Sequence, residues 1–130
     1  MMDEPVFLEL EDVLDFHDEL LERHGGETGI RDLGLLESAM AQPKARFGGE
    51  YLHENLFLMA SAYAFHIAEN QPFLDGNKRT GLLAALTFLD LNGVPIEAPS
   101  NRLYKAMLAI AEGRLDKSGL ADLFRELVHS

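Results

Sequence analysis

Residues 70–81 read NQPFLDGNKRTG and lie in the middle of the most hydrophobic region of the chain. Pro72 and Gly76 are turn-forming residues, so this stretch predicts a loop. Before it, apolar residues recur on one helical face over about residues 53–69. After it, residues 77–91 are rich in Leu and Ala and end at an Asn-Gly pair. The pattern predicts two central helices joined by a polar loop.

The N-terminal part of the chain predicts two further helices and a hairpin. Apolar residues recur at helical spacing over residues 8–26, until a pair of glycines ends the pattern. Residues 31–43 predict a shorter helix, with Asp32 as its N-cap and Pro43 as its stop. Residues 43–52 carry two glycines between alternating larger residues and predict a short hairpin, or flap.

The C-terminal part predicts two more helices. A connector with two prolines covers residues 94–99, and Ser100 is the expected N-cap of a helix that reaches about Glu112. Residues 117–128 form a last amphipathic pattern. The chain has no internal repeat and no linker, so we expect one domain over residues 1–130: an all-α, compact bundle of about six helices with a short flap hairpin.

The composition excludes several classes of protein. The formal net charge of −11 argues against direct nucleic-acid binding, because phosphate backbones require a basic face. No apolar run reaches the length of a membrane span, and the first residues, MMDEPVF, do not resemble a signal peptide. The absence of cysteine excludes disulfides and thiolate metal sites. We expect a cytoplasmic protein with no membrane partner.

The loop has the composition of an anion-binding site. A helix N-terminus presents unpaired N–H groups and the positive end of the helix dipole, and Gly76-Asn77 lies where these groups would point outward. Lys78 and Arg79 add a point charge and a bidentate fork. Asp75 could bind a magnesium ion that bridges phosphates. The alternative is an ordinary cap and turn followed by a solvated Lys-Arg pair.

The histidines show no metal-ligand spacing. His66 is expected to be a partly buried structural residue that points away from the loop, five residues before Gln71. The other four histidines are expected on the surface: His17, His24, His53 and His129. Three apolar residues of the first central helix are expected in the core: Met59, Tyr63 and Phe65.

The sequence QPFLDGNKRT, residues 71–80, resembles the Fic/Doc motif, which reads His-Pro-Phe-x-Asp/Glu-Gly-Asn-Gly/Lys-Arg. Lys78, followed by Thr80, is similar to the Doc (death-on-curing) branch of that family. The similarity extends over about residues 8–128. It implies the Fic fold, a compact bundle of helices with the motif in a loop between two of them, in agreement with the helical pattern.

The resemblance also implies a role for each motif residue. Asp75 would bind the metal ion, Gly76 and Asn77 would form the anion nest, and Arg79 would hold phosphate. Phe73 would anchor the loop in the core. The nucleotide would therefore be bound by the loop and by the start of the helix after it.

The Doc branch implies a particular activity and particular partners. Nucleotidyl-transferring relatives carry glycine at the place of Lys78, whereas in Doc proteins the lysine accompanies transfer of the γ-phosphate of Mg-ATP to a protein. The family target is a translation elongation factor, which the flap at residues 43–52 would align beside the site. The chain lacks the family's inhibitory helix motif, since Leu108 stands at its hydroxyl position. Inhibition would then come from a separate antitoxin protein.

The sequence departs from the motif at Gln71, where the family has its catalytic histidine. That histidine takes the proton of the attacking hydroxyl, and an amide has no titratable nitrogen for this task. Loss of a general base costs about 10²–10⁴ in rate. Gln71 could still orient a hydroxyl. Three interpretations follow: an active Doc-type protein kinase, a catalytically impaired protein that binds nucleotide or antitoxin, and, least favoured because of Lys78, a nucleotidyltransferase (AMPylation).

Overall fold

The computed structural model describes residues 4–96 and 101–128. Over these residues the chain forms six α-helices, a 3₁₀ turn and a two-stranded hairpin. Their bounds are α1 Leu10–His24, α2 Leu33–Ala41, η1 Gln42–Lys44, β1 Arg46–Phe47, β2 Glu50–Tyr51, α3 Leu56–Asn70, α4 Asn77–Leu91, α5 Asn101–Ala111 and α6 Lys117–Val128. The predicted all-α bundle with a short hairpin is confirmed.

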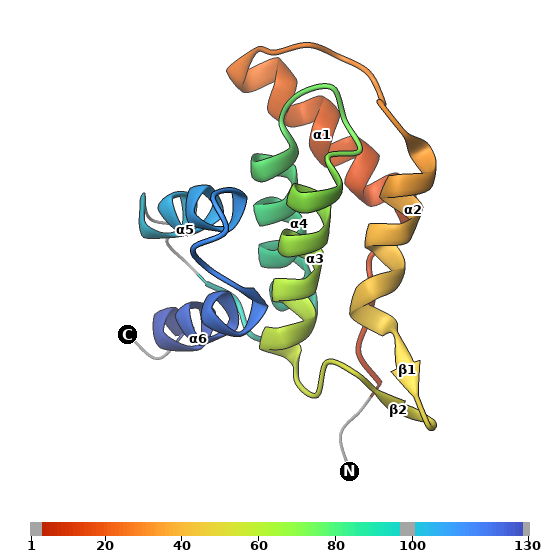
Figure 1. Cartoon of the computed structure of the whole chain (residues 1–130), viewed down its shortest axis with the longest axis vertical. Coiled ribbons are helices and arrows are strands. Elements are labelled where there is room, and N and C mark those ends of the chain that lie inside the picture. The colour runs from red at the N-terminus through yellow and green to blue at the C-terminus, as the bar shows by residue number, and fades with distance from the viewer. Residues whose placement is uncertain (1–3, 97–100, 129–130) are drawn as a thin grey trace.

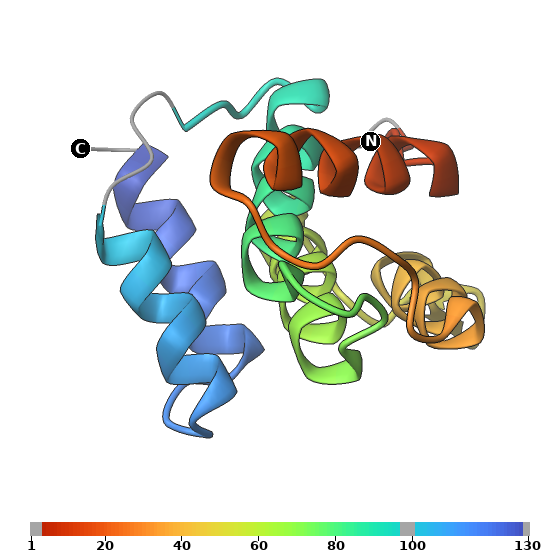
Figure 2. The same cartoon turned by 90° about the horizontal axis from the view of Figure 1, so that it is seen from above.

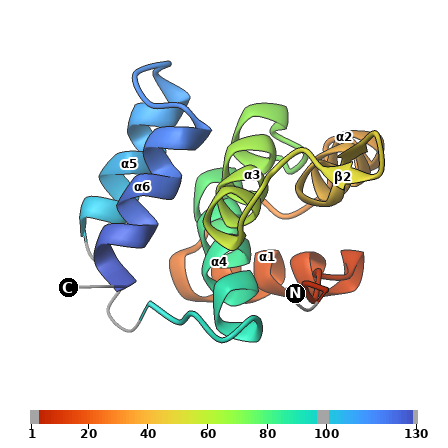
Figure 3. The same ribbon diagram turned by 90° about the horizontal axis from the view of Figure 1, so that it is seen from below.

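Helices α3 and α4 form the centre of the molecule (Figure 1). Helices α5 and α6 lie together on one side of this pair and α2 lies on the other, while α1 runs across α4 (Figure 2). Seen from below, the hairpin lies at the end of α2, away from α5 and α6 (Figure 3). The loop predicted to bind an anion joins the two central helices.

The close approach of α3 and α4 depends on small residues. A Cβ atom on Gly81 of α4 would lie 2.9 Å from the carbonyl oxygen of Ala64 in α3. Ala64, Ala84 and Ala85 are fully buried in the same region. Glycine in a helix interior lowers the stability of the helix by about 1 kcal/mol relative to alanine, so the role of Gly81 here is in packing. It allows the two helix backbones to touch.

Local caps set most of the helix ends. The Asp32 side chain accepts a hydrogen bond from the amide of Leu35 (3.1 Å), as predicted for the N-cap of α2. Asn55 caps α3 in the same way through the amide of Leu58 (2.9 Å), so this helix begins at Leu56, three residues later than predicted. Ser100, the predicted cap of α5, lies outside the described residues.

The core contains the residues expected of the first central helix. Met59 and Tyr63 are fully buried, and Phe65 packs against the core from a partly buried position. The hydroxyl of Tyr63 accepts a hydrogen bond from the amide of Leu8 (3.0 Å), and burial raises the pKa of Tyr63 to about 12. In the described part of the chain, every helix is too short or too polar to cross a membrane.

Candidate functional site

The loop between α3 and α4 begins and ends with left-handed backbone. Gln71 caps the C-terminus of α3 with φ 48° and ψ 58°, and no other non-glycine residue of the described chain has a positive φ. Gly76 caps the N-terminus of α4 with φ 79°. Glycine adopts this conformation freely, but a glutamine does so at a cost. The backbone at residue 71 is therefore held in place by its surroundings.

The segment before α2 runs beside the loop and provides that support. The amides of Arg31 and Asp32 both donate to the carbonyl oxygen of Pro72, at 2.7 and 3.0 Å. The amide of Leu74 donates to the carbonyl oxygen of Gly29 (3.1 Å). These bonds pair the loop with an extended segment some forty residues earlier in the chain.

Two side chains of the motif fix the loop from within. Phe73 is buried, with 1% of its surface exposed, as the anchoring role requires. Its amide donates to Oδ1 of Asn77 (3.0 Å), and its carbonyl accepts from Nδ2 of the same residue (3.0 Å). The Asn77 side chain is thus used inside the loop, and what Asn77 can offer a ligand is its backbone N–H.

His17 of α1 packs against the loop. The surface position predicted for this residue is wrong. The ring is 3% exposed and stacks on Phe73, with centroids 3.8 Å apart. Its Nε2 lies 2.8 Å from the carbonyl oxygen of Asp75 and donates to it, because a carbonyl can only accept. His17 follows Val13 by one helical turn, and these two are the buried residues of α1. That spacing is the signal by which the sequence could have placed it.

The first turn of α4 opens onto a cavity. The backbone N–H groups of residues 77–79 have no hydrogen-bond partner among the described residues, and the first bond of the helix runs from the amide of Thr80 to Gly76. The cavity has a volume of about 240 Å³. Five of the six predicted site residues line it: Gln71, Asp75, Gly76, Asn77 and Lys78. Glu69 lies on the same wall.

Arg79, the sixth predicted site residue, lines a neighbouring cavity of about 230 Å³. Asp75 and Gly76 line both cavities. The end of α1, including His24, also lines this second cavity. The Arg79 guanidinium lies over the ring of Tyr104 in α5, 5.2 Å from its centroid. Lys78 and Arg79 therefore line two neighbouring cavities that share Asp75 and Gly76.

The Asp75 carboxylate is exposed and partly paired with backbone. It accepts from the amide of Gly76 (2.9 Å) and from that of Glu27 (3.3 Å). In the part of the chain that the structure describes, no group of three or more His, Cys, Asp or Glu side chains could hold a metal ion. A metal ion at Asp75 would need its other ligands from water or from a bound phosphate.

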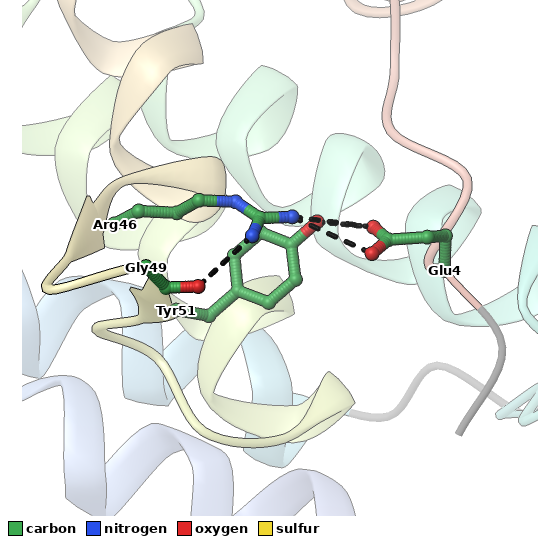
Figure 4. A network of polar contacts seen from close by, with 4 residues as sticks. All are labelled: Glu4, Arg46, Gly49 and Tyr51. Atoms are coloured by element: carbon green, nitrogen blue, oxygen red, sulfur yellow. Dashed lines mark hydrogen bonds and ion pairs between the residues drawn. The ribbon is translucent and has the colours of Figure 1, made fainter. Parts of the chain in front are cut away.

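The hairpin predicted at residues 43–52 is tied to the N-terminal segment. Glu4 faces Arg46 and Tyr51 (Figure 4): the Tyr51 hydroxyl donates to it at 2.5 Å, and Nη2 of Arg46 lies 3.4 Å from its Oε1. The Arg46 guanidinium also stacks over the Tyr51 ring, 4.1 Å from its centroid, and donates to the carbonyl of Gly49 (3.1 Å). Phe47, beside the turn, is 80% exposed.

His53 and His66 lie away from the loop. Nζ of Lys117 in α6 lies 3.0 Å from Nε2 of His66 and 3.2 Å from Nε2 of His53. His66 therefore points away from the loop, as predicted. The surface position predicted for His53 is wrong, since this ring is 8% exposed beneath Lys117. His24 is exposed as predicted, and His129 lies outside the described residues.

Burial, and secondarily the Lys117 charge, lowers the pKa of His66 to about 4. The same two causes lower the pKa of His53. Burial also lowers the pKa of Lys117. Near neutral pH this cluster therefore consists of one cation between two neutral imidazoles, which accept its hydrogen bonds.

Comparison with known proteins agrees with the motif and the fold. The Fic/DOC family model matches residues 7–89. Toxin Doc of Mycolicibacterium smegmatis (strain ATCC 700084 / mc(2)155) is 45% identical over 74 residues, which cover 57% of this chain and 57% of that protein. Protein kinase doc of Escherichia phage P1 is 34% identical over 120 residues, or 92% of this chain and 94% of that protein. The chain therefore belongs to the Fic/DOC family, as a Doc-like member.

Proposed function

We propose that this chain is a Doc-like toxin that binds Mg-ATP and transfers its γ-phosphate to a hydroxyl of a protein target, such as a translation elongation factor. One observation carries the proposal: Asn77 and Lys78 of the first turn of α4, whose backbone amides have no partner among the described residues, line a cavity together with Gln71 and Asp75. This arrangement combines an anion nest, a cation, a carboxylate and a residue able to contact the acceptor hydroxyl.

The size of the cavity and the groups at the start of α4 suit phosphates, although the carboxylates of Glu69 and Asp75 also line the cavity. Unpaired N–H groups and the helix dipole favour an anion at the start of α4, and Lys78 adds a full positive charge. A volume of about 240 Å³ is below the roughly 300–1,000 Å³ of sites that enclose a whole drug-sized ligand. We infer that the phosphate chain occupies this cavity, that it extends past Gly76 toward Arg79, and that the nucleoside lies outside.

Asp75 fits a magnesium ion held jointly with a nucleotide. Mg²⁺ in nucleotide sites uses one or two carboxylates together with phosphate oxygens and water. One exposed carboxylate at the rim of the phosphate cavity meets that need. The ion would neutralise charge on the phosphates, while the α4 amides and Lys78 hold them in place.

Gln71 limits the chemistry. Its amide can accept a hydrogen bond from the target hydroxyl and orient it, but it cannot take up the proton near neutral pH. Turnover is then slow, with proton loss left to water. This residue also favours a second candidate function, in which the protein binds nucleotide or antitoxin with little or no transfer.

The partners follow from the family and from the flap. Toxin Doc and Protein kinase doc are the names of two relatives, and they support a toxin that is paired with a separate antitoxin protein and that acts on a protein substrate. The exposed Phe47 at the tip of the hairpin offers an apolar contact for the substrate. The hairpin lies at the N-terminal end of α3 and the loop at its C-terminal end (Figure 1), so a target docked at residues 43–52 would have to extend along α3 to reach the loop.

Labelled ATP tests the activity. The purified protein and its Gln71→His variant are incubated with elongation factor and with ATP labelled at the γ or the α phosphate. Transfer of the γ label, faster by about 10²–10⁴ in the Gln71→His variant, is expected. Transfer of the α label would instead make the protein a nucleotidyltransferase. If the parent transfers no label and Gln71→His does, the parent is a catalytically impaired protein.

Titration with Mg-ATP tests the site itself. Lys78→Ala is expected to weaken binding about tenfold or more, whereas Lys105→Ala, an exposed lysine of α5, should leave it unchanged. Failure of the parent to bind at millimolar Mg-ATP would refute the phosphate site. In a growth assay, Gln71→His should be more toxic than the parent, and Arg79→Ala should reduce that toxicity.

A further inference from the structure

We infer that Arg31 is the positioning residue of this site: it holds residue 71 in its left-handed conformation and so directs that side chain into the phosphate cavity. Nε of Arg31 donates to the carbonyl oxygen of Gln71 at 2.7 Å, and Nη2 donates to that of Asn70 at 2.8 Å. The kinetic consequence of this inference rests on the proposed function, whereas the conformational part does not.

Arg31 contacts three carbonyl groups in succession. Its side chain bonds the carbonyls of Asn70 and Gln71, and its backbone N–H bonds that of Pro72 (2.7 Å). These groups follow the end of α3, where helix carbonyls lack partners and the dipole is negative. A guanidinium is suited to this place because its donors form a rigid fork, which an ammonium group cannot reproduce.

The left-handed conformation of Gln71 explains why such a clamp is needed. Helices that end in this conformation usually place glycine there, since a side chain makes it unfavourable. Here residue 71 carries a side chain that lines the cavity. The left-handed conformation therefore costs free energy at Gln71 that it would not cost at a glycine, and contacts with the surroundings must offset that cost. The two hydrogen bonds of the Arg31 side chain act at this position.

Arg31 is itself held in place by its neighbour. Asp32 caps α2 through the amide of Leu35, and its own amide shares the Pro72 carbonyl with Arg31. The backbone of residue 31 is thus fixed by a helix start on one side and by the loop on the other. The cap of α2 thus positions Arg31, and Arg31 in turn positions residue 71.

The conformational test uses NMR on three proteins: the parent, Arg31→Gln and Arg31→Lys. In Arg31→Gln, the HN–Hα coupling and ¹³C shifts of residue 71 should leave left-handed values. The exchange rate of the Gln71 amide, which bonds the carbonyl of Ile67 in the parent (3.1 Å), should rise at least tenfold. Arg31→Lys should lie between the two and takes the place of Arg31→Gln if that variant does not fold. Arg23→Gln, an exposed arginine of α1, is the matched control and should change neither readout.

The kinetic test uses the Gln71→His background, in which turnover is expected. Adding Arg31→Gln should lower kcat about 10–100-fold and leave the KM for Mg-ATP within twofold, since the phosphates are held by α4. Unchanged geometry and exchange at residue 71 would overturn the inference, whatever happens to kcat. A shifted residue 71 in proteins that never transfer phosphate would uphold the positioning role and refute the proposed activity instead.

Discussion

The imidazole of His17 lies flat against the ring of Phe73, with their planes 8° apart, and donates a hydrogen bond to the carbonyl of Asp75. One side chain of α1 therefore holds both the buried anchor of the loop and the backbone of its exposed carboxylate. It links the first helix, distant in sequence, to the position at which we expect magnesium and phosphate.

Replacement of His17 should destabilise the protein. His17→Ala removes a ring stack, a buried hydrogen bond and the volume of an imidazole, and we expect a loss of about 2–4 kcal/mol in the free energy of unfolding. Urea denaturation measures it. His24→Ala, on the exposed end of the same helix, is the control and should stay within about 0.5 kcal/mol of the parent. Equal effects of the two changes would contradict the supporting role of His17.

Replacement of Gly81 distinguishes packing from helix propensity. Propensity alone predicts that Gly81→Ala stabilises α4 by about 1 kcal/mol. The Cβ would, however, lie 2.9 Å from the backbone oxygen of Ala64, which cannot move without displacing α3. We expect a net loss of about 1–3 kcal/mol, measured by thermal or urea unfolding. A more stable variant would show that the two helices are not in backbone contact.

The cluster of His66, His53 and Lys117 predicts a loss of stability in acid. His66 titrates near its usual 6.5 in the unfolded chain but at about 4 in the folded protein. Between these values the unfolded chain binds a proton that the folded chain does not, so stability falls as pH falls from 6.5 to 4. The imidazole is only half-buried, and we expect a contribution on the order of 1 kcal/mol after solvent screening. His53 acts in the same direction.

The measurement compares unfolding free energies of the parent and of His66→Gln at pH 7.5 and at pH 4.5. The variant has no imidazole to protonate at this position, so its stability should fall less between the two pH values. Parallel pH profiles would contradict the assignment of acid sensitivity to His66.

Removal of the Glu4 carboxylate should loosen the flap and leave the core unchanged. Glu4→Gln weakens the contacts with Arg46 and Tyr51, which are exposed and therefore contribute little to global stability, about 0.5 kcal/mol or less. Amide exchange in residues 45–52 should become several-fold faster. Glu54→Gln is the control, since Glu54 lines the same hollow but makes neither contact. Unchanged exchange in Glu4→Gln would show that the flap is ordered by its own turn.

The helices were predictable because their signals are local. Apolar spacing identified α3 and α4, and the bounds of α4 and α6 agree with the predicted ranges 77–91 and 117–128. The start of α2 follows from the Asp32 side chain, which acts only three residues away. The start of α3 was placed too early because Asn55 was not identified as its cap.

The support of the site could not be predicted in the same way, because it depends on contacts between distant segments. His17 bonds a residue 58 positions later in the chain, and Arg31 one that is 40 positions later. Periodicity reports which face of a helix is buried but not which segment covers it. The resemblance located the motif residues, but the assignment of Lys78 and Arg79 to two different cavities required the structure.

The backbone contact between Gly81 and Ala64 also bears on how the site adapts to different molecules. Because α3 and α4 touch in this way, the loop that connects them cannot act as a hinge. A ligand bound at the loop therefore meets a preorganised surface and induces little rearrangement. Adaptation to new recognition partners is then left to the hairpin, whose tip is exposed and whose polar contacts with the N-terminal segment are made through Glu4. Among proteins of this architecture, the sequence differences that change specificity should therefore be concentrated at the hairpin and nearly absent from the loop between α3 and α4.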